Sequence, residues 1–184
     1  ASDVYKRQVL SEADRMLSVG KSDSAYHVLN KINSHDLNDE DKALYCLLMT
    51  QAMYGMDMES EVDTLIDCSI KYYTGRDNAM LAESYYYKGV VNYAINNADD
   101  AMICLKKAES LSSGLPDKEL YFKILAYIPR INFKSENYSL ALKYGKESLL
   151  YAEKTGKPTF IALTYNLLAC IFEKLGNNDS AYVY

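Results

Sequence analysis

The chain has 184 residues, of which 49% are apolar, and it carries a formal net charge of −5 at pH 7. This composition excludes an intrinsically disordered chain and suits one compact domain or a short array of small repeats. The acidic balance argues against a nucleic acid partner, which needs clustered Lys and Arg, and no apolar run reaches the roughly 20 residues that span a bilayer.

The first residues do not show the succession of charged, apolar and small residues that is typical of a signal peptide, and residues 1–8 fit the helical periodicity that follows them poorly. One interpretation is that these eight residues are a non-native scar and that a true N-terminus is missing. The four cysteines lie far apart in apolar segments with no Cys-x-x-Cys pair, so we predict free thiols and no metal site. Free thiols and the absent signal favour the cytoplasm, whereas an incomplete N-terminus leaves the periplasm open.

Helical spacing recurs in segments that are separated by turn residues. In residues 101–111, Ala and Leu recur at i, i+4, i+7 and i+10, which is one helix face, and residues 81–94 are also helical in pattern. Pro116 and Pro158 follow loop glycines, so we expect each at the first position of a helix. The expected breaks are Gly20, Gly55, 96–97, Gly114, 135–137, Gly156 and Gly176.

One pattern repeats along the chain, marked by a small residue after a short polar helix start. The marker residues are Ala25, Val62, Ala101, Ala141 and Ala181. Successive markers lie 37, 39, 40 and 40 residues apart. Acidic, Ser and Asn residues before the marker suit a helix N-terminus, because they cap free N–H groups and complement the helix dipole. A small residue twelve positions upstream, as at Gly89 and Ala169, would let two helices approach closely.

This pattern resembles the tetratricopeptide repeat (TPR) family in a long-period form, similar to TPR proteins of Bacteroidetes. The best copy, residues 82–111, has Tyr85 at the large aromatic position and Gly89 at the small one. The resemblance implies an all-α fold, a right-handed α-α superhelix in which antiparallel helix pairs form a TPR-like solenoid. The implied repeats are residues 6–36, 37–75, 76–114, 115–156 and 157–184, the last one truncated.

Two features depart from the family pattern. Asn92 and Asn132 stand where the family has a core tyrosine, and Pro129 replaces a small residue inside an expected helix. An interior proline removes a backbone hydrogen bond and usually kinks a helix. Asn132, three residues on, is placed to bond the backbone groups disturbed there. A bent groove and simple drift of a tolerant repeat both explain Pro129.

The sequence offers no catalytic constellation. His27 and His35 are the only histidines, and no nucleophile elbow, P-loop or zinc-protease motif occurs. The acidic run at residues 36–41 lacks the glycine and glutamate of a calcium loop, so we interpret it as a solvated loop leading into a helix. We therefore expect no enzyme activity, no cofactor and no metal.

The family resemblance implies a peptide groove lined by the first helix of each pair. The implied groove residues are Tyr86, Val90, Tyr93, Lys123, Arg130, Phe133, Lys134 and Asn166. The lysine–asparagine clamp of chaperone-binding relatives is absent, because Tyr86 and Val90 occupy the matching positions. Lys123, Arg130 and Lys134 share one side of a helix, so we expect them to anchor an acidic peptide. The competing interpretation is a solvated face whose lysines serve solubility.

We therefore predict a non-catalytic interaction scaffold that binds a protein or peptide partner. Two alternatives remain: a sensor array that controls an output domain missing from this fragment, and a structural spacer that self-associates. The chain stops early in an expected tenth helix, so an apolar face of the fifth repeat should lack its partner and drive self-association. The residues of that face are Ile161, Leu167, Leu168, Ile171, Phe172 and Leu175.

Overall fold

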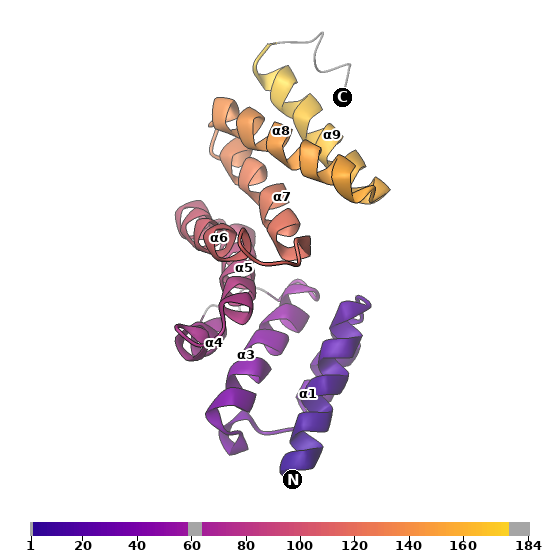
Figure 1. Ribbon diagram of the computed structural model, residues 1–184, viewed down its shortest axis with the longest axis vertical. Coiled ribbons are helices and arrows are strands. Elements are labelled where there is room, and N and C mark those ends of the chain that lie inside the picture. The colour runs from indigo at the N-terminus through magenta and orange to yellow at the C-terminus, as the bar shows by residue number, and fades with distance from the viewer. Residues whose placement is uncertain (1, 59–63, 177–184) are drawn as a thin grey trace. The chain divides into compact units, whose positions relative to one another are not determined.

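A computed structural model describes residues 2–58 and 64–176 (Figure 1). Within these ranges all regular structure is helical, with nine α-helices and one short 3₁₀ helix, η1. Their bounds are α1 Asp3–Ser18, α2 Ser22–Leu29, η1 Ser34–Asp36, α3 Asp39–Tyr54, α4 Leu65–Tyr73, α5 Asn78–Ala94, α6 Ala98–Ser112, α7 Glu119–Lys134, α8 Tyr138–Thr155 and α9 Pro158–Lys174. No helix in the described part of the chain is long and apolar enough to cross a bilayer. The chain divides into two compact units, residues 1–97 (unit 1) and 98–184 (unit 2).

Helices α1, α3, α5, α7 and α9 are each followed, two or three residues after their end, by a residue with left-handed backbone. These residues are Gly20, Asp57, Asn96, Glu136 and Gly176, with φ between 57° and 76°. Their spacings are 37, 39, 40 and 40 residues, the same as those of the sequence markers. Gly, Asn and Asp adopt this conformation most readily, whereas a side chain such as that of Glu136 is strained in it.

A backbone hydrogen bond closes four of these turns. In each, an N–H donates to the carbonyl five residues earlier in the chain, at 2.8–3.0 Å. The donor–acceptor pairs are Lys21–Met16, Met58–Met53, Asn97–Asn92 and Asn137–Asn132. This bond satisfies a carbonyl that the helix end leaves free and turns the chain back on itself. In the second repeat the left-handed residue is Asp57, two positions after the expected Gly55.

The marker residues lie where the second helix of a pair meets its neighbours. Ala25, Ala101 and Ala141 are all 0% exposed, one turn into α2, α6 and α8 respectively. All three marker alanines are therefore closely packed. Val62 and Ala181 lie outside the described residues.

Unit 1 packs α1 to α5 by nearest-neighbour contacts. Helix α2 contacts α1 and α3, and α4 contacts α3 and α5, while the first helices α1, α3 and α5 also contact one another in sequence order (Figure 1). Helix α3 is buried on most of its surface, because other helices cover several of its sides. Its start is capped by Asn38, whose side-chain oxygen accepts from the Asp41 N–H at 2.9 Å. The interpretation of residues 36–41 as a solvated loop is wrong for Asp39, Glu40 and Asp41, which form the first turn of α3 with Asp41 buried.

Residues 3–8, which fit the sequence periodicity poorly, form the first turns of α1. Lys6 Nζ donates to the Asp36 carbonyl at 2.7 Å, and Arg7 forms an ion pair with the buried Asp41 at 3.6 Å. These contacts tie the start of α1 to η1 and to the start of α3.

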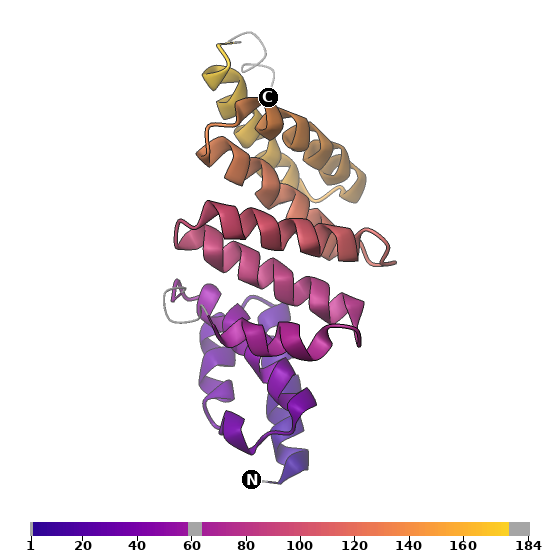
Figure 2. The same ribbon diagram turned by 90° about the vertical axis from the view of Figure 1, so that its left-hand side faces the viewer.

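Unit 2 packs α6 to α9 in the same manner, with α7, α8 and α9 lying side by side (Figure 2). Leu168 and Ile171 of α9 are fully buried against α8. Gly145 of α8 makes this possible, because an added Cβ there would lie 2.8 Å from Leu168 Cδ2. Pro158 opens α9 as predicted, whereas Pro116 lies in the loop before α7 and the prediction for it is wrong.

The expectation that six apolar residues of the fifth repeat lack a partner is wrong for half of them. Leu168, Ile171 and Phe172 are buried, because the small residues of α8 admit the α9 face. Leu175 is exposed, and Ile161 and Leu167 are half-buried.

The two asparagines that depart from the family pattern make the same hydrogen bond in different units. Asn92 Nδ2 donates to the Lys88 carbonyl at 2.9 Å, and Asn132 Nδ2 donates to the Ile128 carbonyl at 3.0 Å. The expectation that Asn132 bonds the backbone groups disturbed by Pro129 is therefore wrong, since Asn92 makes the same bond in a helix without proline. The carbonyl that Asn132 reaches is that of Ile128, not that of Leu125, which loses its usual donor to the proline. Helix α7 continues through Pro129 to Lys134.

The buried marker alanines predict the effect of enlarging them. Ala141→Leu or Ala101→Leu should lower the free energy of unfolding by about 1–3 kcal/mol, because the close-packed helices have no room for the larger side chain. Ala162→Leu, at an exposed position of α9, is the matched control. Chemical denaturation measures all three. Unchanged midpoints for both marker variants would contradict the assigned register.

Candidate functional site

The predicted groove residues of α5 are largely covered. Tyr86 is only 7% exposed and Val90 is 0% exposed, while Tyr93 is half-buried. Tyr86 packs edge-on against Tyr87, with ring centroids 5.0 Å apart. Burial of this kind counts against Tyr86 and Val90 as ligand contacts, so no functional argument below uses them.

The predicted groove residues of α7 remain accessible and carry positive charge. Lys123 and Arg130 are half-buried and Lys134 is exposed. Arg130 lies over the ring of Tyr127, with its guanidinium carbon 5.3 Å from the ring centroid. Phe133 contacts Tyr138 at 5.6 Å between centroids and packs against the core of unit 2. Helix α7 thus presents cations beside an aromatic ring, while Phe133 serves mainly in packing.

The carboxylate of Glu119, at the start of α7, already pairs with one of the cations of this helix. Glu119 forms ion pairs with Lys123 at 3.5 Å and with Lys157, just before α9, at 3.7 Å. These pairs link the start of α7 to the start of α9. Exposed ion pairs contribute little to stability, so a competing carboxylate could replace Glu119 at small cost.

Helix α9 adds an exposed stripe beside α7. Leu163 is 47% exposed, and Asn166 and Cys170 are exposed three and seven residues later. These positions lie 40 residues after Lys123, Ala126 and Arg130, which is the repeat spacing. Helices α7 and α9 are in contact, and the repeat register assigns these accessible positions to the same face of the two helices. We call Lys123, Tyr127, Arg130, Leu163 and Asn166 the α7–α9 face.

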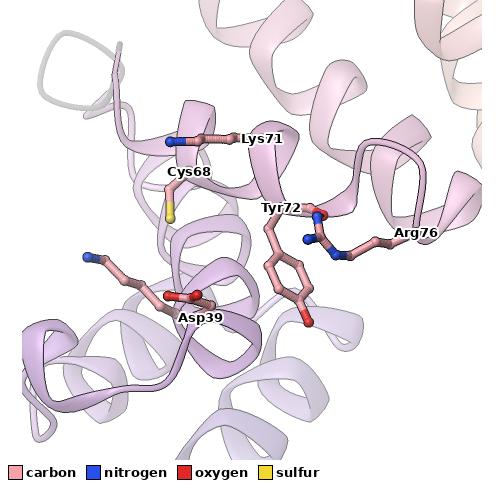
Figure 3. Close-up of a pocket in the computed structure, with 6 residues that line it drawn as sticks. Asp39, Cys68, Lys71, Tyr72 and Arg76 are labelled. Atoms are coloured by element: carbon pink, nitrogen blue, oxygen red, sulfur yellow. The ribbon is translucent and has the colours of Figure 1, made fainter.

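Unit 1 contains a pocket that the sequence did not reveal (Figure 3). Its volume is about 320 Å³. The lining residues, here called the basic pocket, are Asp39, Lys42, Cys68, Lys71, Tyr72 and Arg76. They come from the start of α3, from α4 and from the turn before α5. The sequence gives no local signal for this cluster, because the packing of α3 against α4 brings its two halves together.

Arg76 is the best-fixed cation of the basic pocket. Its Nη1 donates to the Tyr72 carbonyl at 2.6 Å, and its guanidinium carbon lies 4.8 Å from the centre of the Tyr72 ring (Figure 3). The hydrogen bond satisfies a carbonyl at the end of α4, where a cation also complements the helix dipole.

The thiol of Cys68 borders the pocket and neighbours Cys46 in the core behind it. Burial, followed by the proximity of the Cys68 thiol, raises the pKa of Cys46 to about 12. Burial is also the main cause that raises the pKa of Tyr73 to about 12, and the carboxylate of Asp77 adds to it. Both groups therefore stay protonated at neutral pH. Over the described residues, no group of three potential ligands is arranged to hold a metal ion.

Comparison by sequence finds no matching protein family and no matching curated protein. Solved structures do match. TPR-like repeats of a putative kinesin light chain from Podosopora anserina align with a TM-score of 0.76 at 13% identity, covering 100% of this chain and 93% of the other. The MamA protein aligns with a TM-score of 0.69 at 17% identity, covering 98% and 87%.

A third structure is a signal transduction ATPase with numerous domains (STAND) from Pyrococcus horikoshii, which has a tetratricopeptide repeat sensor. It aligns with a TM-score of 0.79 at 17% identity, covering 98% of this chain and 30% of the other. These likenesses extend over nearly the whole sequence. The chain therefore has a TPR-like, all-α helical repeat fold, as the sequence predicted.

The raised pKa values in unit 1 predict a loss of stability at high pH. An unfolded thiol ionises near pH 9 and an unfolded phenol near pH 10, whereas Cys46 and Tyr73 keep their protons in the folded state up to about pH 12. Above pH 9 the unfolded state binds fewer protons than the folded state, so the free energy of unfolding should fall as pH rises.

The Tyr73→Phe variant tests the tyrosine contribution. It keeps the buried ring and removes the titrating hydroxyl, so the decline above pH 10 should be shallower than in the parent protein. Tyr5→Phe, at an exposed position, is the control. Urea denaturation at a series of pH values measures the effect. Equal slopes for the parent and Tyr73→Phe would contradict it.

Proposed function

We propose that the protein is a non-catalytic interaction scaffold and that the α7–α9 face binds an acidic segment of a partner protein. The observation that carries this proposal is the accessible combination of Lys123 and Arg130 with exposed Leu163 in neighbouring first helices of unit 2. TPR-like repeats commonly serve as protein-binding scaffolds, which supports the general role but identifies no partner.

The chemistry of the face defines the expected ligand. Arg130 can pair with a carboxylate through two parallel hydrogen bonds, and Lys123 offers a second cation seven residues away. Leu163 provides apolar contact beside these charges. A segment with Asp or Glu next to an aliphatic or aromatic side chain matches this arrangement.

A second candidate is a sensory array that regulates an output domain. The favouring observation is the alignment with the STAND protein, in which a tetratricopeptide repeat sensor is part of a much longer chain. The same binding face would serve this role, because a sensor also has to bind its signal. Coding sequence for an output domain adjoining this segment would favour the sensor over a free-standing scaffold.

Peptide selection tests the proposed binding face. Short random peptides selected on the protein should become enriched in Asp and Glu beside apolar residues. Lys123→Glu combined with Arg130→Glu should weaken binding of a selected peptide by roughly tenfold or more. Glu119→Gln should strengthen it, because this change frees Lys123 and Lys157 from their internal carboxylate.

Lys143→Glu combined with Lys154→Glu on α8 is the matched control, since it changes the net charge equally on another helix. Fluorescence anisotropy gives the affinities, and circular dichroism checks the fold. Selection without acidic enrichment, or equal weakening by both double variants, would show that the α7–α9 face is not the binding site.

A further inference from the structure

The basic pocket of unit 1 concentrates positive charge in an acidic protein. Three of its lining side chains, Lys42, Lys71 and Arg76, are cationic, and Asp39 is the one carboxylate among the six. The lining therefore carries two positive charges in excess at neutral pH. Figure 3 shows Lys71 on α4, Arg76 beside Tyr72 in the turn that follows α4, and Asp39 at the start of α3.

Local carboxylates do not neutralise the two lysines. Asp67 stands four residues before Lys71 on α4, yet it pairs with Lys88 of α5 at 2.5 Å. Within residues 2–58 and 64–176, neither Lys42 nor Lys71 has a carboxylate within ion-pair distance. Their ammonium groups are available to an anion that enters the pocket.

Arg76 supplies directional recognition. Its contacts with the Tyr72 carbonyl and ring fix the guanidinium at the pocket, although only one of its two Nη groups bonds that carbonyl. A guanidinium has five N–H donors and matches the oxygens of carboxylate and phosphate groups. The Tyr72 ring adds an apolar wall beside these donors.

We propose that the basic pocket binds a phosphate monoester. A phosphate monoester carries about −1.5 to −2 charges at pH 7, which matches the excess charge of the lining, whereas one carboxylate would leave half of it uncompensated. The volume of about 320 Å³ is at the lower end of the range for small-molecule sites. It suits a phosphorylated side chain or a small phosphorylated molecule, and it is too small for a dinucleotide.

This inference goes beyond the scaffold role and uses none of its residues. The basic pocket lies in unit 1 and the α7–α9 face lies in unit 2, so either assignment can fail without affecting the other. A ligand on a partner protein would make the pocket a second contact point, and a free ligand would make it an effector site.

Calorimetric titration of the full chain with phenyl phosphate, and with phenyl sulfate as control, tests the proposal. The two esters have nearly the same shape, but the sulfate carries a single charge. We expect saturable binding of the phosphate and binding of the sulfate that is weaker by roughly tenfold. A peptide containing phosphoserine, compared with its unphosphorylated form, distinguishes a protein-borne ligand from a free one. Failure of both phosphate probes to bind would overturn the proposal.

Three variants locate the binding. Lys42→Gln combined with Lys71→Gln should weaken phenyl phosphate binding by roughly tenfold, whereas Asp39→Asn should strengthen it severalfold by adding to the positive excess. Lys21→Gln combined with Lys31→Gln, at exposed positions of unit 1, should have no such effect. Thermal melts verify that each variant is folded. The assignment would be refuted if Asp39→Asn left the affinity for phenyl phosphate unchanged and both double lysine variants lowered it equally, because the anion would then bind elsewhere.

Discussion

The fold depends on a left-handed residue that follows each of α1, α3, α5 and α7, and on the backbone hydrogen bond that closes the turn there. The turn satisfies a carbonyl that the helix end leaves free, and α2 packs on α1, α4 on α3 and α8 on α7. The marker alanine then falls in the contact region and is fully buried. The turn recurs every 37–40 residues, with the same spacings as the sequence markers.

The sequence predicted the fold because the repeat is marked by residues that are close together in the chain. Polar helix starts and small markers recur at fixed spacing, and the turn residues follow the same spacing in the structure. The functional surfaces were predicted less completely. Register alone could not indicate that Tyr86 and Val90 are buried, since burial depends on neighbouring helices. Lys42 and Arg76 are 34 residues apart in sequence, and their proximity to one pocket follows from the packing of α3 and α4.

The two candidate binding surfaces use cations differently. On the α7–α9 face, Lys123 is already paired with Glu119, so a ligand has to compete with an internal carboxylate. In the basic pocket, Asp67 pairs with Lys88, which leaves the charge of Lys71 to a ligand. The pairing of Glu119 and of Asp67 therefore distinguishes the two proposed anion sites.

The difference in stability between Gly and Ala at position 136 tests the left-handed turn most directly. Glycine in the middle of a helix destabilises a protein by about 0.5–1 kcal/mol relative to alanine, whereas at a left-handed position alanine is the strained residue. With φ at 60° for Glu136, the variant Glu136→Gly should be more stable than Glu136→Ala by about 1 kcal/mol in chemical denaturation. The opposite sign would mean that α7 does not end in this turn, and it would contradict the repeat on which the fold is based.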